Sequence, residues 1–325
     1  MINMRLCSRE YRALCSLLIL IFMISLSGCK GTVNTKSTDV KTKETSASFP
    51  LTITDDLGRK VTIEKEPKRI VSLAPSNTEI LFFLGLGDRV VGVTSYCDYP
   101  EEAKLITKIG GFKDPSLEKI VILKPDLILA TGMHEQLIKG LEDAGLDVLV
   151  VKPNTIEEII NTIQFVGRAA GVEDKAVILT KDLKDRVNAV SEKTGKIPAN
   201  ERLTVYYEMW YEPLMSVGRS SMIGQIIELA GGINVTDGCA EQYPQISEEV
   251  IIKKNPQVMV NSYGHDAKKI TPEEIAGRKG WKEISFIKNN RIYTIESDCL
   301  TIAGPRIVEG LEMMAKYLYP ELFKN

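Results

Sequence analysis

The chain has 325 residues, with 41 basic and 43 acidic side chains and a formal net charge of −2. Its length leaves room for more than one domain. Because no basic stripe with interleaved aromatic residues occurs, the composition argues against a nucleic-acid partner.

The N-terminal segment predicts export and anchoring. Arg5, Arg9 and Arg12 form a basic start, and residues 13–26 form an apolar run of the length typical of a signal peptide, too short to span a bilayer comfortably. The sequence Leu-Ser-Gly-Cys that ends at Cys29 resembles a lipoprotein box, which implies cleavage before Cys29 and lipid attachment to its sulfur. An ordinary secretory signal or an N-terminal anchor helix is the alternative. We expect residues 1–28 to be a signal peptide, and residues 29–48, rich in Thr, Ser and Lys, to be a lipidated flexible tether outside the cytoplasm.

Residues 49–155 are expected to form an N-terminal lobe in which strands alternate with helices. The alternation predicts a largely parallel sheet. Asn77 or Ser76 is expected to cap the first helix. The expected strands are 69–73, 90–94, 126–130 and 147–151, and the expected helices are 78–84 and one that begins at 115–118.

Residues 156–200 are expected to connect the two lobes through helices over 156–170 and 173–194. In the second helix, apolar residues recur at steps of three and four, which gives one apolar face. A helix of about 22 residues is roughly 33 Å long, enough to act as a stiff strut between lobes.

Residues 201–325 are expected to form a C-terminal lobe that repeats the pattern. Its strands are expected at 203–207, 257–260 and 291–295, and its helices at 221–229 and 307–318. Segments 119–134 and 250–265 are similar: a helix end runs into a proline (Pro125, Pro256), followed by an apolar run and a loop with a His nine residues after the proline. The repeat predicts an α/β fold of two similar lobes, with both loops at the carboxyl ends of strands, where ligands of open α/β sheets bind.

Several segments together resemble the substrate-binding lipoproteins of ABC importers that capture cobalamin and iron–siderophore complexes, the class III periplasmic-binding family. The resemblance covers about residues 69–323, and the SYCDYP loop at 95–100 favours the cobalamin branch. It implies two Rossmann-like lobes joined by one long helix, with a ligand cleft between them. It also implies a monomer without enzymatic activity or catalytic cofactor, which delivers a corrinoid to the membrane subunits of a permease with their ATPase. The segments that carry it are PKRIVSLAPSNTEIL at 67, GVTSYCDYPEEA at 92, IGGFKDPSLEKIVILKPDLILA at 109, IGQIIELAGGINV at 223, YPQISEEVIIKKNPQVMV at 243 and SDCLTIAGPRIVEGLEMMA at 297.

The resemblance also implies roles for single residues. Glu118 and Glu228, one from each lobe, are expected to dock against permease arginines, with solvated helix glutamates as the alternative. A flat corrin needs broad rigid surfaces with few polar anchors, although any one aromatic residue can instead pack beneath its own loop. The expected cleft residues are Tyr96, Phe112, Met209, Trp210, Tyr243 and Asp298.

Three cysteines and two histidines depart from the family pattern. They follow predicted strands on the expected cleft side, which resembles a soft-ligand set for a metal or a metal chelate. A disulfide between Cys239 and Cys299 is the alternative, since sequence alone does not fix a pairing. The five residues are Cys97, His134, Cys239, His265 and Cys299.

Three other classes of function stay open, one of which is a plain adhesin or sensor ectodomain with the same fold. The same fold with a different ligand would bind a ferric siderophore, haem or another metal chelate. Arg219 and Arg306 are the candidates to face an anionic chelate, although Arg306 follows Gly-Pro and is better suited to orienting a loop. A tethered enzyme has little support, because the chain lacks GxSxG, HExxH, GxxxxGK[ST] and CxxC motifs.

Overall fold

Two four-stranded parallel sheets and one antiparallel hairpin make up the strands of the structure, a computed structural model that describes residues 48–262 and 270–324. Residues 1–47, which include the predicted signal peptide and Cys29, lie outside the described part. The hairpin pairs β1 (Leu51–Thr54) with β2 (Lys60–Ile63). The first sheet has the order β4-β3-β5-β6, with bounds Val90–Val93, Ile70–Ser72, Leu127–Ala130 and Val148–Val150. The second has the order β10-β9-β7-β8, with bounds Ile292–Thr294, Val258–Asn261, Thr204–Glu208 and Ile233–Asn234.

Helices cover both faces of the first sheet, because alternate residues of its strands point to opposite sides. In β5, Ile128 and Ala130 pack with residues of α3 (Leu117–Ile122) and α4 (Glu135–Asp143). Leu127 and Leu129 pack on the other face, in the cluster that holds the buried residues of α2 (Pro75–Phe83) and α5 (Ile156–Ala169). These elements, with β1 and β2, are called the first lobe.

The second sheet is covered in the same way. Tyr206 and Met259 face the buried residues of α8 (Glu248–Lys254), α9 (Pro272–Ala276) and α10 (Ser285–Lys288). Val205 and Val260 face α7 (Met222–Leu229) and α12 (Ile307–Leu318). These elements, with α11 (Asp298–Thr301), are called the second lobe.

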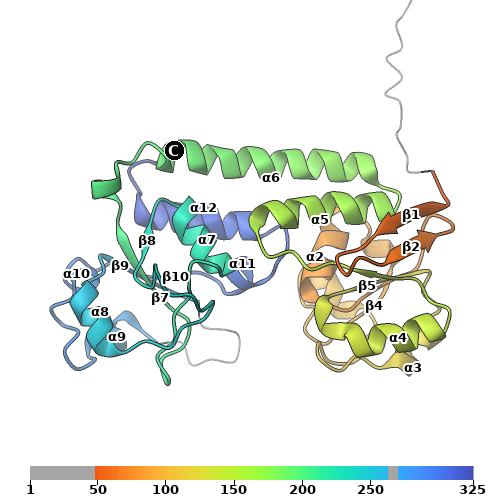
Figure 1. The fold of residues 1–325 in the computed structure, drawn as a ribbon, viewed down its shortest axis with the longest axis horizontal. Coiled ribbons are helices and arrows are strands. Elements are labelled where there is room, and N and C mark those ends of the chain that lie inside the picture. Colours follow the sequence, from red (N-terminus) through yellow and green to blue (C-terminus); the bar gives the residue numbers. More distant parts are fainter. Residues whose placement is uncertain (1–47, 263–269, 325) are drawn as a thin grey trace, which may run out of the picture. The chain divides into compact units, whose positions relative to one another are not determined.

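The long helix α6 (Glu173–Thr194) has the predicted bounds and joins the two lobes. It packs against α5 at one end and against α12 and α7 at the other (Figure 1). One hydrophobic cluster runs from Leu127 in the first sheet through Ala176 and Leu183 of α6 to Val205 in the second. The lobes therefore share a core beneath the strut, and the predicted α/β class with parallel sheets is confirmed.

The prediction for α2 was wrong at its start. The helix begins at Pro75 rather than Thr78, its N-cap is Ala74, and neither Ser76 nor Asn77 caps it. Proline at the first helical position has a φ that suits the helix and lacks an N–H that would go unpaired there. The other helical segments are short 3-10 turns at Gly87–Arg89, Glu101–Leu105, Gly132–His134 and Ala199–Glu201.

The repeat seen in the sequence is a repeat of structure. Ser116 and Ser247 are the N-caps of α3 and α8, and each helix leads into the strand that lies beside the first strand of its sheet, β5 or β9. Lys124 and Asn255, the residues before the two prolines, both have φ of 47°, the left-handed region. The first lobe's α3 therefore has α8 as its counterpart, while α2 corresponds to α7 because each follows the first strand of its sheet. Within the described part of the chain, no helix combines the length and apolar character that crossing a membrane requires.

Candidate functional site

A cavity of about 650 Å³ lies between the lobes. Its first-lobe wall consists of residues 74–76 after β3, Tyr96 after β4, and the loop 112–114. Residues 301–303, at the end of α11, line it from the second lobe. The cavity thus lies beyond the carboxyl ends of parallel strands, where α/β sheets bind their ligands.

The loop that carries Tyr96 is anchored from below, while the Tyr96 side chain itself is 65% exposed. The buried thiol of Cys97 is within hydrogen-bond distance of the hydroxyls of Thr78 (3.1 Å) and Thr94 (3.2 Å), and Lys108 Nζ donates to the Cys97 carbonyl. Burial raises the pKa of the Cys97 thiol. A buried, protonated thiol is a poor metal ligand. The Cys97 side chain instead anchors the loop through its contacts with Thr78 and Thr94.

Phe112, the second predicted residue in the cavity wall, is held by His134. The backbone N–H of Thr131 points to His134 Nδ1 at 3.2 Å, so this nitrogen accepts, and Nε2 must carry the proton that it donates to the Phe112 carbonyl at 2.8 Å. The two rings meet edge to face, with centroids 5.5 Å apart. With both nitrogens engaged and its side chain buried, His134 positions Phe112 rather than offering a free ligand.

The predicted second-lobe residues Met209, Trp210 and Tyr243 lie on two bridged segments beyond β7. Met215 pairs with both Trp210 and Gln245, and Ser216 N–H donates to the Pro244 carbonyl. The three side chains are exposed by 37%, 50% and 43%, respectively. They are brought together, but they do not belong to the lining of the 650 Å³ cavity.

A buried ion pair supports this aromatic loop. Glu208, the last residue of β7, accepts two hydrogen bonds from Arg278 at 2.6 and 2.8 Å and one from the Tyr206 hydroxyl at 2.8 Å. The Arg278 guanidinium also lies over the rings of Tyr211 (3.8 Å) and Trp281 (4.6 Å). Neither charged residue was identified from the sequence.

Asp298, the remaining predicted cleft residue, is buried and contacts Arg306 at 3.4 Å. Arg306 precedes α12 and also binds Glu79 of α2 through Nε (3.1 Å) and Nη2 (2.5 Å). Burial is the largest influence on Glu79 and raises its pKa to about 7, although the Arg306 hydrogen bond opposes the rise. Arg306 therefore holds α2 and α11 together through Glu79 and Asp298. Its partner Glu79 could not be found from local sequence patterns.

The cysteines of residues 48–262 and 270–324 do not form a disulfide. All three cysteines in the described part are free, with Cys97 and Cys299 buried and Cys239 exposed. Across residues 48–262 and 270–324, no three His, Cys, Asp or Glu side chains are grouped to hold a metal. His265 lies outside the described residues, so the constellation predicted from the sequence is not assembled by its described members.

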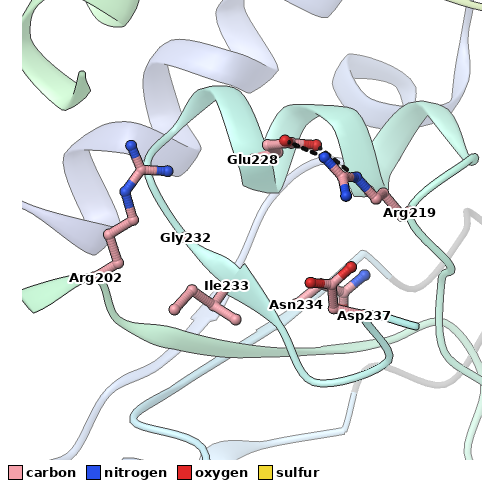
Figure 2. A pocket seen from close by; sticks show the side chains of 8 residues that line it. Arg202, Arg219, Glu228, Gly232, Ile233, Asn234 and Asp237 are labelled. Carbon is pink, nitrogen blue, oxygen red and sulfur yellow. Dashed lines mark hydrogen bonds and ion pairs between the residues drawn. The ribbon is translucent and has the colours of Figure 1, made fainter. Parts of the chain in front are cut away.

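The two predicted docking glutamates have different surroundings. Glu118 is exposed on the first turn of α3. Glu228 lies near the end of α7, where Figure 2 shows its carboxylate turned toward Arg219, which donates to it at 2.7 and 3.1 Å beside a pocket of about 130 Å³. This pairing also occupies Arg219, the other arginine considered for an anionic chelate. The repeat instead gives Glu118 the counterpart Glu249, since each lies seven residues before its proline, exposed on the equivalent helix.

Comparisons with known proteins agree with this architecture. A family model described as periplasmic binding protein matches residues 70–299. The uncharacterized ABC transporter substrate-binding lipoprotein YvrC of Bacillus subtilis (strain 168) is 38% identical over 315 residues, covering 94% of this chain and 97% of that protein. A vitamin B12-binding protein of Vibrio vulnificus (strain YJ016) is 29% identical over 264 residues, covering 79% and 92%. A crystal structure from Staphylococcus epidermidis ATCC 12228, named as a possible iron-binding (periplasmic solute-binding) protein, has a TM-score of 0.68 and 31% identity, and covers 78% of this chain and 100% of that one.

Proposed function

The chain belongs to the periplasmic binding protein family, and we propose that it captures a corrinoid, cobalamin or cobinamide, and delivers it to an ABC-type import permease. It is a substrate-binding transport protein rather than an enzyme, as its relatives are. The observation that carries the proposal is the cavity between the lobes, with the aromatic residues Tyr96 and Phe112 in its wall. The vitamin B12-binding relative supports the choice of ligand.

The aromatic walls suit a large, flat ligand. Hydrogen bonds to the Cys97 and Phe112 carbonyls anchor the loops that carry Tyr96 and Phe112, so the backbone of these loops loses little freedom when a ligand binds. On the second lobe, Met209, Trp210 and Tyr243 supply further exposed apolar surface beyond the carboxyl end of β7. We propose that the ligand extends from the cavity to these three residues of the second lobe.

A second ligand class is an iron chelate, a ferric siderophore or haem. The possible iron-binding neighbour from Staphylococcus epidermidis favours it, as does Lys113 in the cavity wall, which offers a positive charge to an anionic chelate. Against a siderophore stands the engagement of Arg219 and Arg306 with carboxylates.

We further propose that the protein is lipid-anchored at Cys29, faces outside the cytoplasm and works as a monomer. The Bacillus relative is named a lipoprotein, which is consistent with such an anchor. Mass spectrometry of the protein recovered from membranes tests the anchor, since a diacylglyceryl-modified N-terminal peptide beginning at Cys29 is expected.

Docking to the permease is proposed to use one carboxylate from each lobe, Glu118 from the first and Glu249 from the second. The Ser247 hydroxyl beside Glu249 holds the pKa of that carboxyl below its usual value, so it is ionised at neutral pH. One turn after each glutamate, Val121 and Ile252 are exposed by 40% and 41%, so both lobes present the same pair of a carboxylate and an apolar side chain. Glu228 remains the alternative second-lobe residue, although Arg219 already occupies its carboxylate.

Calorimetric titration of the purified protein with cyanocobalamin, cobinamide, a ferric siderophore and haemin tests the ligand. We expect one-to-one binding of a corrinoid. A response only to the siderophore or to haemin would keep the binding fold and transfer the function to iron uptake.

Tyr96→Ala is expected to weaken binding of the corrinoid by about 1–3 kcal/mol, the value of one aromatic contact that buries apolar surface. The free energy of unfolding should stay near that of the wild type, because Tyr96 is exposed. Val177→Ala is the matched control, since Val177 is a half-exposed apolar residue of α6, away from the cavity wall. Equal affinity of Tyr96→Ala and the wild type would remove Tyr96 from the ligand site.

A further inference from the structure

A buried ion pair, Glu79 with Arg306, lies close in sequence to both walls of the cavity between the lobes. Glu79 lies on α2, one turn after the wall residue Ser76, and Arg306 comes three residues after the wall residue Ala303. The two side chains are 1% and 4% exposed, and they are 227 positions apart in the chain. The pair therefore joins the first-lobe wall directly to the second-lobe wall.

Arg306 connects more than these two walls. Its guanidinium contacts Asp298 of α11, and it lies over the ring of Tyr99 at 3.8 Å. Tyr99 belongs to the same loop as Tyr96, the most exposed aromatic residue of the cavity wall. A planar guanidinium can meet a carboxylate edge and an aromatic face at once, which an ammonium group cannot reproduce.

The fit around the pair is close. Glu79 Oε2 has no hydrogen-bond partner in the described part of the chain, and a Cβ added at Gly304 would lie 2.9 Å from it. A buried carboxylate oxygen without a partner is costly, so the pair is poor as a source of stability alone. A costly cluster that joins the two walls of a ligand cavity indicates a role in geometry.

We propose that Arg306 is a positioning residue for the ligand cleft, which fixes the spacing of the two cavity walls through Glu79 and holds the Tyr96 loop through Tyr99. This inference rests on the proposed function in so far as the cavity is the ligand site. Arg306 does not line the cavity, so it acts on affinity through the wall residues. Its loss would let the walls and the loop move before the ligand arrives, and binding would then have to order them.

The test compares Arg306→Lys, which keeps the charge, and Glu79→Gln, which keeps the shape, with the wild type. Hydrogen–deuterium exchange of the purified full-length protein without ligand is measured on peptides that cover 92–106 and 296–306. We expect faster exchange in these two segments for both variants, and unchanged exchange in β5 and α6. Titration with cyanocobalamin is expected to show affinity lower by about tenfold, which corresponds to roughly 1.4 kcal/mol.

Arg186→Lys is the matched control. Arg186 of α6 makes the same kind of two-pronged contact with Glu312 of α12, at 2.8 and 2.7 Å, away from the cavity. It should leave exchange in both segments and the affinity unchanged. The swap Glu79→Arg with Arg306→Glu restores the ion pair, and recovery of at least part of the affinity would support the proposal.

Three outcomes overturn it. Unchanged exchange in both segments would show that Arg306 fixes neither wall. A uniform rise of exchange over the whole chain would show a general structural role instead. Normal cyanocobalamin affinity with locally faster exchange would show that wall spacing does not govern binding. If the wild type itself does not bind cyanocobalamin, the proposed ligand fails, while the exchange comparison still decides the role of Arg306.

Discussion

Reversal of both docking charges, Glu118→Arg with Glu249→Arg, is expected to abolish ligand uptake while the ligand affinity of the purified protein stays unchanged. Both residues are exposed on the first turn of equivalent helices, and neither lines the cavity. Like charges at an interface cost several kcal/mol, so two reversals should slow uptake by roughly a hundredfold or more. Uptake of labelled ligand by cells and calorimetry of the same variant are the two measurements.

The pair Glu118→Arg with Glu228→Arg is the comparison that separates the two candidate surfaces. The resemblance assigned docking to Glu228, whereas the structure gives α8 rather than α7 as the counterpart of α3. We expect this pair to show only the effect of Glu118, because Glu228 is already bound to Arg219. A complete block by this pair and not by the other would return docking to α7. Normal uptake in both double variants would remove the carboxylates from docking altogether.

Arg278→Ala is expected to lower the free energy of unfolding by about 3–5 kcal/mol, the cost of leaving a buried charge without its partner. Glu208 would lose two of its hydrogen bonds, and the guanidinium would vanish from between the rings of Tyr211 and Trp281. Urea unfolding followed by circular dichroism measures the loss. Since Tyr211 adjoins Trp210, ligand affinity should fall as well.

The double variant Arg278→Met with Glu208→Gln is the informative control. It removes both charges while the amide can still accept from the Tyr206 hydroxyl. Replacing both members of a buried pair is far less costly than removing one, so the double variant should be more stable than Arg278→Ala. If Arg278→Ala lowers the free energy of unfolding by less than about 1 kcal/mol, the Arg278–Glu208 pair contributes no more than a surface ion pair, and the prediction is wrong.

The elements that were predicted well are those whose signal is local. The bounds of α6 and α12 follow from long apolar periodicity, and β5 from an apolar run after a proline. The helices α9, α10 and α11 have four or five residues, too few for a periodic pattern, and were not predicted. The start of α2 was misplaced because two good capping residues outweighed a proline that begins a helix.

The residues of the candidate site also divide into those with a local sequence signal and those without one. Tyr96 and Phe112 were predicted because a motif marks their loops, and both line the cavity. The residues that hold these loops were misread or not found. His134 and Cys97 were considered as metal ligands, whereas their partners are the Phe112 carbonyl and two threonine hydroxyls. Glu79 and Arg306 meet only in the folded chain, so no spacing in the sequence reveals them.

The two equivalent turns of the repeat make each lobe an internal reference for the other. Lys124 and Asn255 occupy the same left-handed position before a proline, yet asparagine adopts this conformation more readily than lysine. The second lobe thus has a residue suited to the turn, while the first lobe has a less suitable one at the same place. Substitutions can therefore be chosen by placing the residue of one lobe at the equivalent position of the other. The structural repeat gives the alignment of the two lobes that such a choice needs.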